Sequence, residues 1–94
     1  MCAGTVEIAE VSGSAKGAGG WFPVERAQAV YDHSFHAQME EALVLEFVNP
    51  ARGAGARVSV ELSAGSARSL IGIIEAALED GERRHGPLAA SGTA

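Results

Sequence analysis

The chain has 94 residues, with 7 Lys and Arg against 12 Asp and Glu, which gives a formal net charge of -5. This length fits one small domain, and the acidic balance without a basic stripe excludes non-specific nucleic-acid binding, which needs clustered cations. No apolar run reaches the roughly 18 residues of a membrane span, no secretory signal is recognised, and a single cysteine cannot form an intrachain disulfide, so we expect a cytoplasmic protein.

The first half of the chain predicts two strands separated by a loop. Thr5–Val11 alternates weakly between apolar and polar residues, which is the period of a strand. Ser12–Gly20 contains four glycines and two serines, so we expect a mobile loop there. Trp21–Asp32 is again extended in pattern, because Pro23 disfavours helix at Phe22 and the residues after it alternate.

The second half predicts two more strands and one helix. Ala42–Val48 is apolar on both faces, and Arg57–Leu62 alternates sharply, with turn-forming residues between the two. Ser63 is a suitable N-cap for a helix that runs to about Asp80, and Gly81 suits its C-terminal cap. We therefore predict one domain over residues 1–81 and a disordered tail over residues 82–94.

The predicted fold is α+β, with a four-stranded antiparallel sheet in β-β-β-β-α order and the C-terminal amphipathic helix on one face. Four helix residues at helical spacing, Leu70, Ile71, Ile74 and Leu78, are expected to pack on that sheet. The helix would take the face of Leu43, Leu45 and Phe47. Val44 and Val48 would then be left in water on the opposite face, so we expect a homodimer through it.

Four residues form the candidate site: Cys2, Asp32, His33 and His36. If the first two strands pair as a hairpin, the start of the first lies beside the end of the second, which brings these residues to one rim with the helix N-terminus. A thiolate and two imidazoles, with an α-amine if Cys2 becomes the first residue of the mature chain, suit zinc, copper or iron better than magnesium or calcium.

Other interpretations of the same residues remain open. Cys2 could instead be a nucleophile with a histidine as its base, in a cofactorless thiol enzyme. His33 and His36 could be ordinary surface histidines. The pair Trp21-Phe22 could line a small-molecule pocket, or it could close the end of a core.

Several short segments together carry a resemblance. They are the opening Met-Cys, Val6–Glu10, Ser12–Gly17, Gly20–Val24, Asp32-His33 with His36, and Val60–Ser63. In these, the chain resembles a group of short, uncharacterised proteins from high-GC actinobacteria, over residues 1 to about 80. The resemblance implies a bacterial source and transfers no activity or cofactor.

The sequence therefore predicts a small metal-binding protein. A more specific form of this hypothesis is a metal-dependent enzyme that acts on a small molecule. The rival hypothesis is a non-catalytic dimeric accessory or interaction module in which the rim residues are incidental. Metal content of protein with a native N-terminus separates the two.

Overall fold

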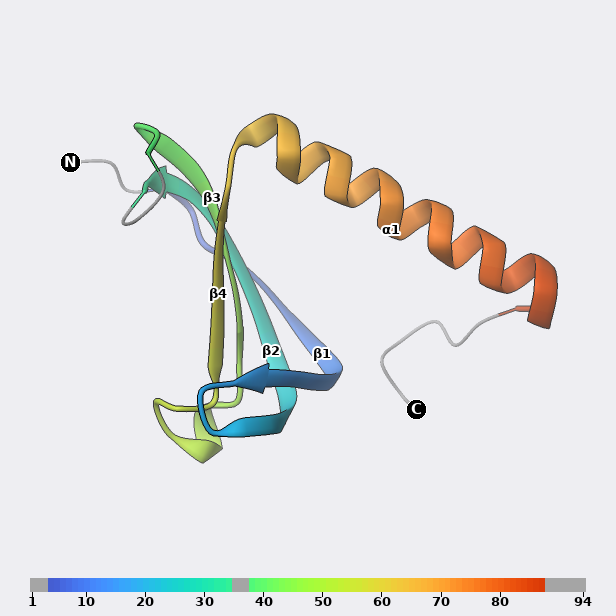
Figure 1. Cartoon of the computed structure of the whole chain (residues 1–94), viewed down its shortest axis with the longest axis horizontal. Coiled ribbons are helices and arrows are strands. Elements are labelled where there is room, and N and C mark those ends of the chain that lie inside the picture. Colours follow the sequence, from blue (N-terminus) through green and yellow to red (C-terminus); the bar gives the residue numbers. More distant parts are fainter. Residues whose placement is uncertain (1–3, 35–37, 88–94) are drawn as a thin grey trace.

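The computed structural model describes residues 4–34 and 38–87 as four strands followed by one long helix. The strands β1 (Glu7–Gly17), β2 (Gly20–His33), β3 (Glu41–Val48) and β4 (Arg57–Leu62) precede the helix α1 (Ala64–His85), and a 3-10 turn η1 (Pro50–Arg52) joins β3 to β4. Each strand pairs antiparallel with the next, in the order β1-β2-β3-β4 (Figure 1). The predicted α+β class and the β-β-β-β-α order are confirmed.

The segment Ser12–Gly20 is not the mobile loop that we expected. Its first part completes β1 up to Gly17, and the chain turns at residues 18 and 19 before β2 begins at Gly20. A register shift between Glu10 and Gly13 bends the hairpin. Gly17 passes close to other backbone, because a Cβ there would lie 3.1 Å from the carbonyl oxygen of Gly55. Glycine in this segment therefore allows two backbone segments to lie close together, as well as allowing the turn.

The bent hairpin builds the small core. Phe22 and Val24 of β2 are buried together with Ala56, which lies just before β4. Partly buried residues from β1, β3 and β4 pack around them: Val11, Ala15, Phe47 and Val58. Trp21 is 71% exposed, so it neither closes this core nor shares the burial of its neighbour Phe22.

Asn49 ties the β3–β4 connection to β2. Its side chain is buried, with Nδ2 donating to the carbonyl oxygen of Pro23 at 2.9 Å and Oδ1 accepting from the backbone N–H of Ala51 at 3.1 Å. Both ends of the amide are thus satisfied, which a buried polar group requires. Sequence analysis predicted a turn here but not this bond between distant segments.

The strand register separates an apolar face of the sheet from a more polar one. Cross-strand partners share a face, and successive residues alternate between faces. One face, called the inner face below, carries three residues of β3 and their partners on β4. These pairs are Leu43 with Leu62, Leu45 with Val60, and Phe47 with Val58. Their neighbours on β2 are Tyr31, Ala29 and Ala27. Several of these side chains stay open to solvent: Tyr31 is 48% and Val60 36% exposed.

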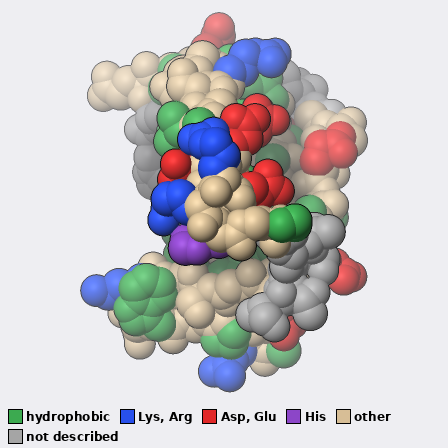
Figure 2. All heavy atoms as spheres, turned by 90° about the vertical axis from the view of Figure 1, so that its right-hand side faces the viewer, with side chains coloured by type: hydrophobic (Ala, Val, Ile, Leu, Met, Phe, Trp, Pro, Cys, Tyr) green, Lys and Arg blue, Asp and Glu red, His purple; other side chains and the backbone are tan. Residues whose placement is uncertain are grey.

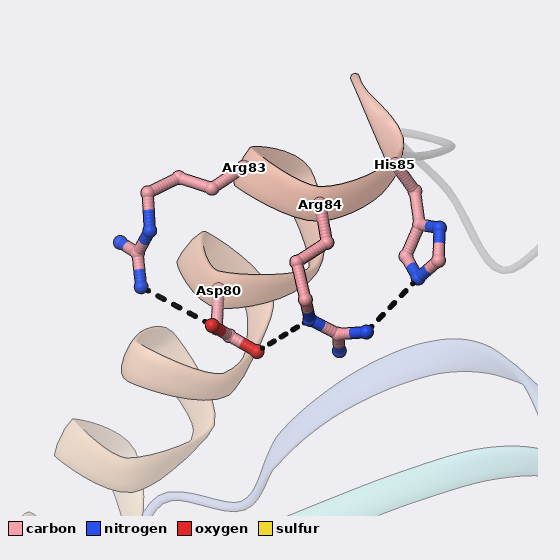
Figure 3. A network of polar contacts seen from close by, with 4 residues as sticks. All are labelled: Asp80, Arg83, Arg84 and His85. Atoms are coloured by element: carbon pink, nitrogen blue, oxygen red, sulfur yellow. Dashed lines mark hydrogen bonds and ion pairs between the residues drawn. The ribbon is translucent and has the colours of Figure 1, made fainter.

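The helix α1 begins as predicted and ends later than predicted. Ser63 caps it, its Oγ accepting from the backbone N–H of Ser66 at 3.1 Å. The helix passes through Gly81 and ends at His85, with Gly86 at a φ of 83°. In the last turn Asp80 accepts from Arg83 Nη2 at 3.3 Å and Arg84 Nε at 2.9 Å (Figure 3). Such pairs support a helix and offset part of the cost of Gly81 within it.

The expected packing of α1 on its own sheet is wrong. The helix leaves the end of the sheet and runs away from it (Figure 1), and Ile71, Ile74 and Leu78 are 49–55% exposed. Within the apolar side of α1, burial is limited to its start, where Ala67 and Leu70 are half-buried and the helix meets β3 and β4. The connection from β4 is the single residue Ser63, so the direction of the helix is set at its first turn.

The shape of the chain reflects this extended helix. The radius of gyration is 14.9 Å, whereas a compact chain of this length has about 12.4 Å. Seen from the side toward which the helix points, acidic and basic side chains are interspersed and hydrophobic side chains reach the surface in several places (Figure 2). None of the helices within the described ranges has both the length and the apolar composition needed to cross a membrane.

Candidate functional site

The predicted rim lies where β2 ends and β3 begins. β2 ends at His33, which pairs with Glu41 at the start of β3. The carboxylate of Asp32 accepts from the backbone N–H of His33 at 2.7 Å. Ser34 Oγ donates to the carbonyl oxygen of Met39. The ends of both strands are therefore fixed by side chains as well as by the sheet.

The imidazole of His33 is oriented by the acidic residues opposite it. Its Nδ1 lies 3.2 Å from Glu41 Oε2 and 3.5 Å from the carbonyl oxygen of Glu40. A histidine held by a carboxylate through one nitrogen is typical of metal ligands, which bind the metal through the other nitrogen. The side chain of His33 is 57% exposed, so the pair also fits an ordinary surface contact.

Gly4, the first described residue, and the start of the helix both lie at this rim. Gly4 packs against β2 so closely that a Cβ on it would lie 2.6 Å from the carbonyl oxygen of Tyr31. Leu62, which directly precedes the Ser63 cap, pairs with Leu43, two residues from Glu41. The antiparallel register thus brings the start of β1, the end of β2 and the start of α1 to one rim.

The metal site itself stays a prediction. Cys2 and His36 lie outside the described residues, so the structure places two of the four predicted residues, Asp32 and His33. Within residues 4–34 and 38–87, no three His, Cys, Asp or Glu side chains are grouped closely enough to hold a metal ion. The carboxylate of Asp32 is engaged by the backbone of its neighbour, and Glu41 is the acidic side chain that reaches His33.

A polar cluster on the other face of the sheet was not predicted. Glu46, in the middle of β3, accepts from Gln28 Nε2 at 3.0 Å and from Ser59 Oγ at 2.7 Å. Arg57 Nη1 lies 3.6 Å from the same carboxylate. The Ser59 hydrogen bond is the main cause that lowers the pKa of Glu46; burial opposes it, and Gln28 and Arg57 add to the lowering. The sequence signal was the charge at Glu46, but its partners follow only from the register.

This cluster changes the surface expected for self-association. We predicted a dimer through the face of Val44 and Val48, yet Val48 is already buried within the chain. Glu46 and its partners occupy the centre of that face. A shallow recess of about 420 Å³ adjoins it, lined in part by Arg26 and Arg57. Open apolar surface lies on the inner face and on α1, while on the face of Glu46 it includes Ile8 of the edge strand β1, which is 61% exposed.

Comparisons with known proteins place the chain without assigning it an activity. Searches of curated proteins and of solved structures give no match. A family model described as a family of unknown function, DUF6295, matches residues 1–87, which include the whole sheet and all of α1. The chain therefore belongs to the DUF6295 family.

Proposed function

We propose that this chain is a non-catalytic accessory or interaction module that works as a homodimer. The observation that carries the proposal is the exposure of the apolar side of α1, where Ile71 is 55% and Leu78 54% exposed. An amphipathic helix normally buries that side. In this chain the apolar side of α1 is exposed to solvent, so a second surface is needed to cover it.

The surface area of the chain supports a partner of ordinary size. The accessible surface is 6886 Å², whereas a compact monomer of 9.6 kDa exposes roughly 5,100 Å². The difference of about 1,790 Å² is more than the roughly 800 Å² that each partner contributes to a standard interface. The chain therefore exposes enough surface for a dimer interface of ordinary size.

The expected affinity follows from the side chains involved. Fully burying an Ile or Leu side chain contributes about 1.5–3 kcal/mol, and three residues on the apolar side of α1 are about half exposed: Ile71, Ile74 and Leu78. Two helices then contribute about 7 kcal/mol, with a similar amount from the surfaces that receive them. The cost of association is about 4–15 kcal/mol, and a dissociation constant in the micromolar range corresponds to a cost of about 6 kcal/mol, in the lower part of that range.

Sedimentation equilibrium of the unmodified protein between about 1 and 200 µM tests the proposal. We expect a mass that rises toward twice 9.6 kDa. Ile74→Glu should weaken association at least tenfold, because a charge would enter the interface. Ser69→Glu, which adds the same charge to the opposite side of the same helix, is the matched control and should leave association unchanged. A monomer at all concentrations overturns the proposal.

A second candidate function, metal binding at the rim, is favoured by the orientation of His33. Its Nδ1 faces Glu41, and Gly4, two residues after Cys2, packs against the end of β2 that leads into His33. We propose that Cys2, His33 and His36 bind zinc, copper or iron, with Asp32 beside them.

The metal proposal is tested on untagged protein prepared without chelators and offered zinc, copper, iron and nickel in turn. About one ion per chain should survive dialysis, and acidification should release it because protons compete for the ligands. His33→Ala and His36→Ala should each reduce occupancy, whereas His85→Ala, at the end of α1, should not. Loss of metal binding in the His85 variant, or none in the unmodified protein, refutes this proposal and leaves the dimeric module.

The finer assignments of compartment and source also belong to the proposal. The single cysteine agrees with a reducing compartment such as the cytoplasm. The segments shared with short actinobacterial proteins support a source in that group. Neither assignment affects the tests above.

A further inference from the structure

We infer that the dimer forms by reciprocal helix packing, in which α1 of each chain lies on the inner face of the other chain's sheet. This inference rests on the proposed homodimer and specifies which surfaces meet. The partner that covers each exposed helix is thus a second copy of the same chain.

Each chain carries both complementary surfaces, and beyond the start of α1 they do not cover each other. The apolar side of α1 is exposed at Ile71, Ile74 and Leu78, and the inner face is open at Tyr31 and Val60. The single-residue connection at Ser63 sends the helix away from its own sheet (Figure 1). Two copies related by a twofold axis can cover both surfaces at once, because each contact then occurs twice.

At its centre, the opposite face of the sheet is too polar to receive the helix. That face holds Glu46 with Gln28 and Ser59 in hydrogen bonds and with Arg57 in an ion pair. An apolar helix laid over these groups would remove the water around a carboxylate and a guanidinium without replacing it. The inner face presents Leu43, Leu45 and Leu62 at the corresponding positions, with no charged residue among their cross-strand partners on β2 and β4.

The helix is also long enough to cover a second sheet. α1 has 22 residues and is therefore about 33 Å long, whereas β3 has 8 residues and is about 26 Å long. After its first two turns the helix still has enough length to cross the strands of another sheet. The apolar residues Ile71, Ile74 and Leu78 all lie in that later part.

Crosslinking between two different single-cysteine chains tests this packing. Cys2→Ser removes the natural thiol, and one chain then carries Ile74→Cys on the helix while the other carries Val60→Cys on the inner face. The chains bear tags of different mass and are mixed at a concentration where the unmodified protein is dimeric. A short bis-maleimide should link the helix variant to the sheet variant.

Two matched pairs serve as controls. Ser69→Cys replaces Ile74→Cys on the other side of the helix, and Ser59→Cys replaces Val60→Cys on the other face of the same strand. Each replacement should reduce the mixed product at least fivefold. Dimers of Ile74→Cys alone would indicate helix-to-helix packing, and dimers of Val60→Cys alone would indicate sheet-to-sheet packing.

The possible results separate this inference from the proposed function. If sedimentation shows a dimer but the mixed product does not exceed the controls, reciprocal packing is refuted and the dimeric module stands. A chain carrying both Val60→Cys and Ile74→Cys that links only within itself also refutes it, because the helix then folds back on its own sheet. If sedimentation shows only monomer, the proposed function fails first, and this inference fails with it.

Discussion

Replacing Phe22 by Ala should remove a large part of the stability of the sheet. Phe22 is 7% exposed and lies at the centre of the small core, packed with Val24 and Ala56. A buried Phe→Ala change costs about 3–5 kcal/mol, because the transferred surface is lost and a cavity is left. A domain of this size has a total stability of roughly 5–14 kcal/mol, so the variant should be close to unfolding.

The neighbouring residue supplies a matched control. Trp21 is larger but 71% exposed, so Trp21→Ala should change the free energy of unfolding by no more than about 0.5 kcal/mol. Urea unfolding followed by circular dichroism, at one protein concentration for all variants, gives both values. If Trp21→Ala costs as much as Phe22→Ala, the inward and outward positions of the two aromatic rings are wrong, and with them the bent β1–β2 hairpin.

Three further predictions concern polar contacts. Ser59→Ala should lower the free energy of unfolding by about 1 kcal/mol at pH 7. Because the pKa of Glu46 is lowered in the folded chain, its stabilisation is present above the unfolded pKa of about 4.3 and is lost as the pH falls through the lower folded pKa. Urea titrations should therefore show a smaller difference between the two proteins at pH 3. Asn49→Asp should cost about 2–3 kcal/mol, since it loses the donor to Pro23 and buries a charge; thermal unfolding unchanged from the parent would contradict this. Ser63→Ala should cost about 1 kcal/mol and reduce the helical signal at 222 nm, and an unaltered signal would show that the cap is dispensable.

The strands with strong internal alternation were predictable from their own residues. Arg57–Leu62 forms β4 with the expected bounds, and Ala42–Val48 forms β3 with one more residue at its start. The glycine-rich Ser12–Gly17 was missed because its strand character comes from its partner β2 and not from its side chains. A pattern search within one segment cannot detect a strand that is stabilised by pairing.

The helix shows a similar division between local and distant causes. The Ser63 cap and the apolar spacing were sufficient to predict its start. Its end was missed because Gly81 was given its usual role as a terminator, whereas the ion pairs of Asp80 support another turn. Amphipathic spacing also predicts that one side will be buried, but it does not say against which surface or which molecule.

The candidate rim was partly predictable for a topological reason. Antiparallel pairing alone brings the start of β1, the end of β2 and the start of α1 to one end of the sheet, whatever their side chains. The contact between His33 and Glu41 needs the exact cross-strand register, and so do the partners of Glu46. Sequence reasoning therefore located the region but not the pairs within it.

Helix formation and self-association are coupled in this chain. α1 contains Gly65, Gly72 and Gly81, and each internal glycine costs roughly 1 kcal/mol relative to alanine. A helix of this length gains most of its stability from packing its apolar side, and within one chain that packing is limited to Ala67 and Leu70. A partner surface would therefore stabilise the helix itself as well as join two chains. The contacts that hold the proposed dimer are then the same contacts that keep the second half of α1 helical.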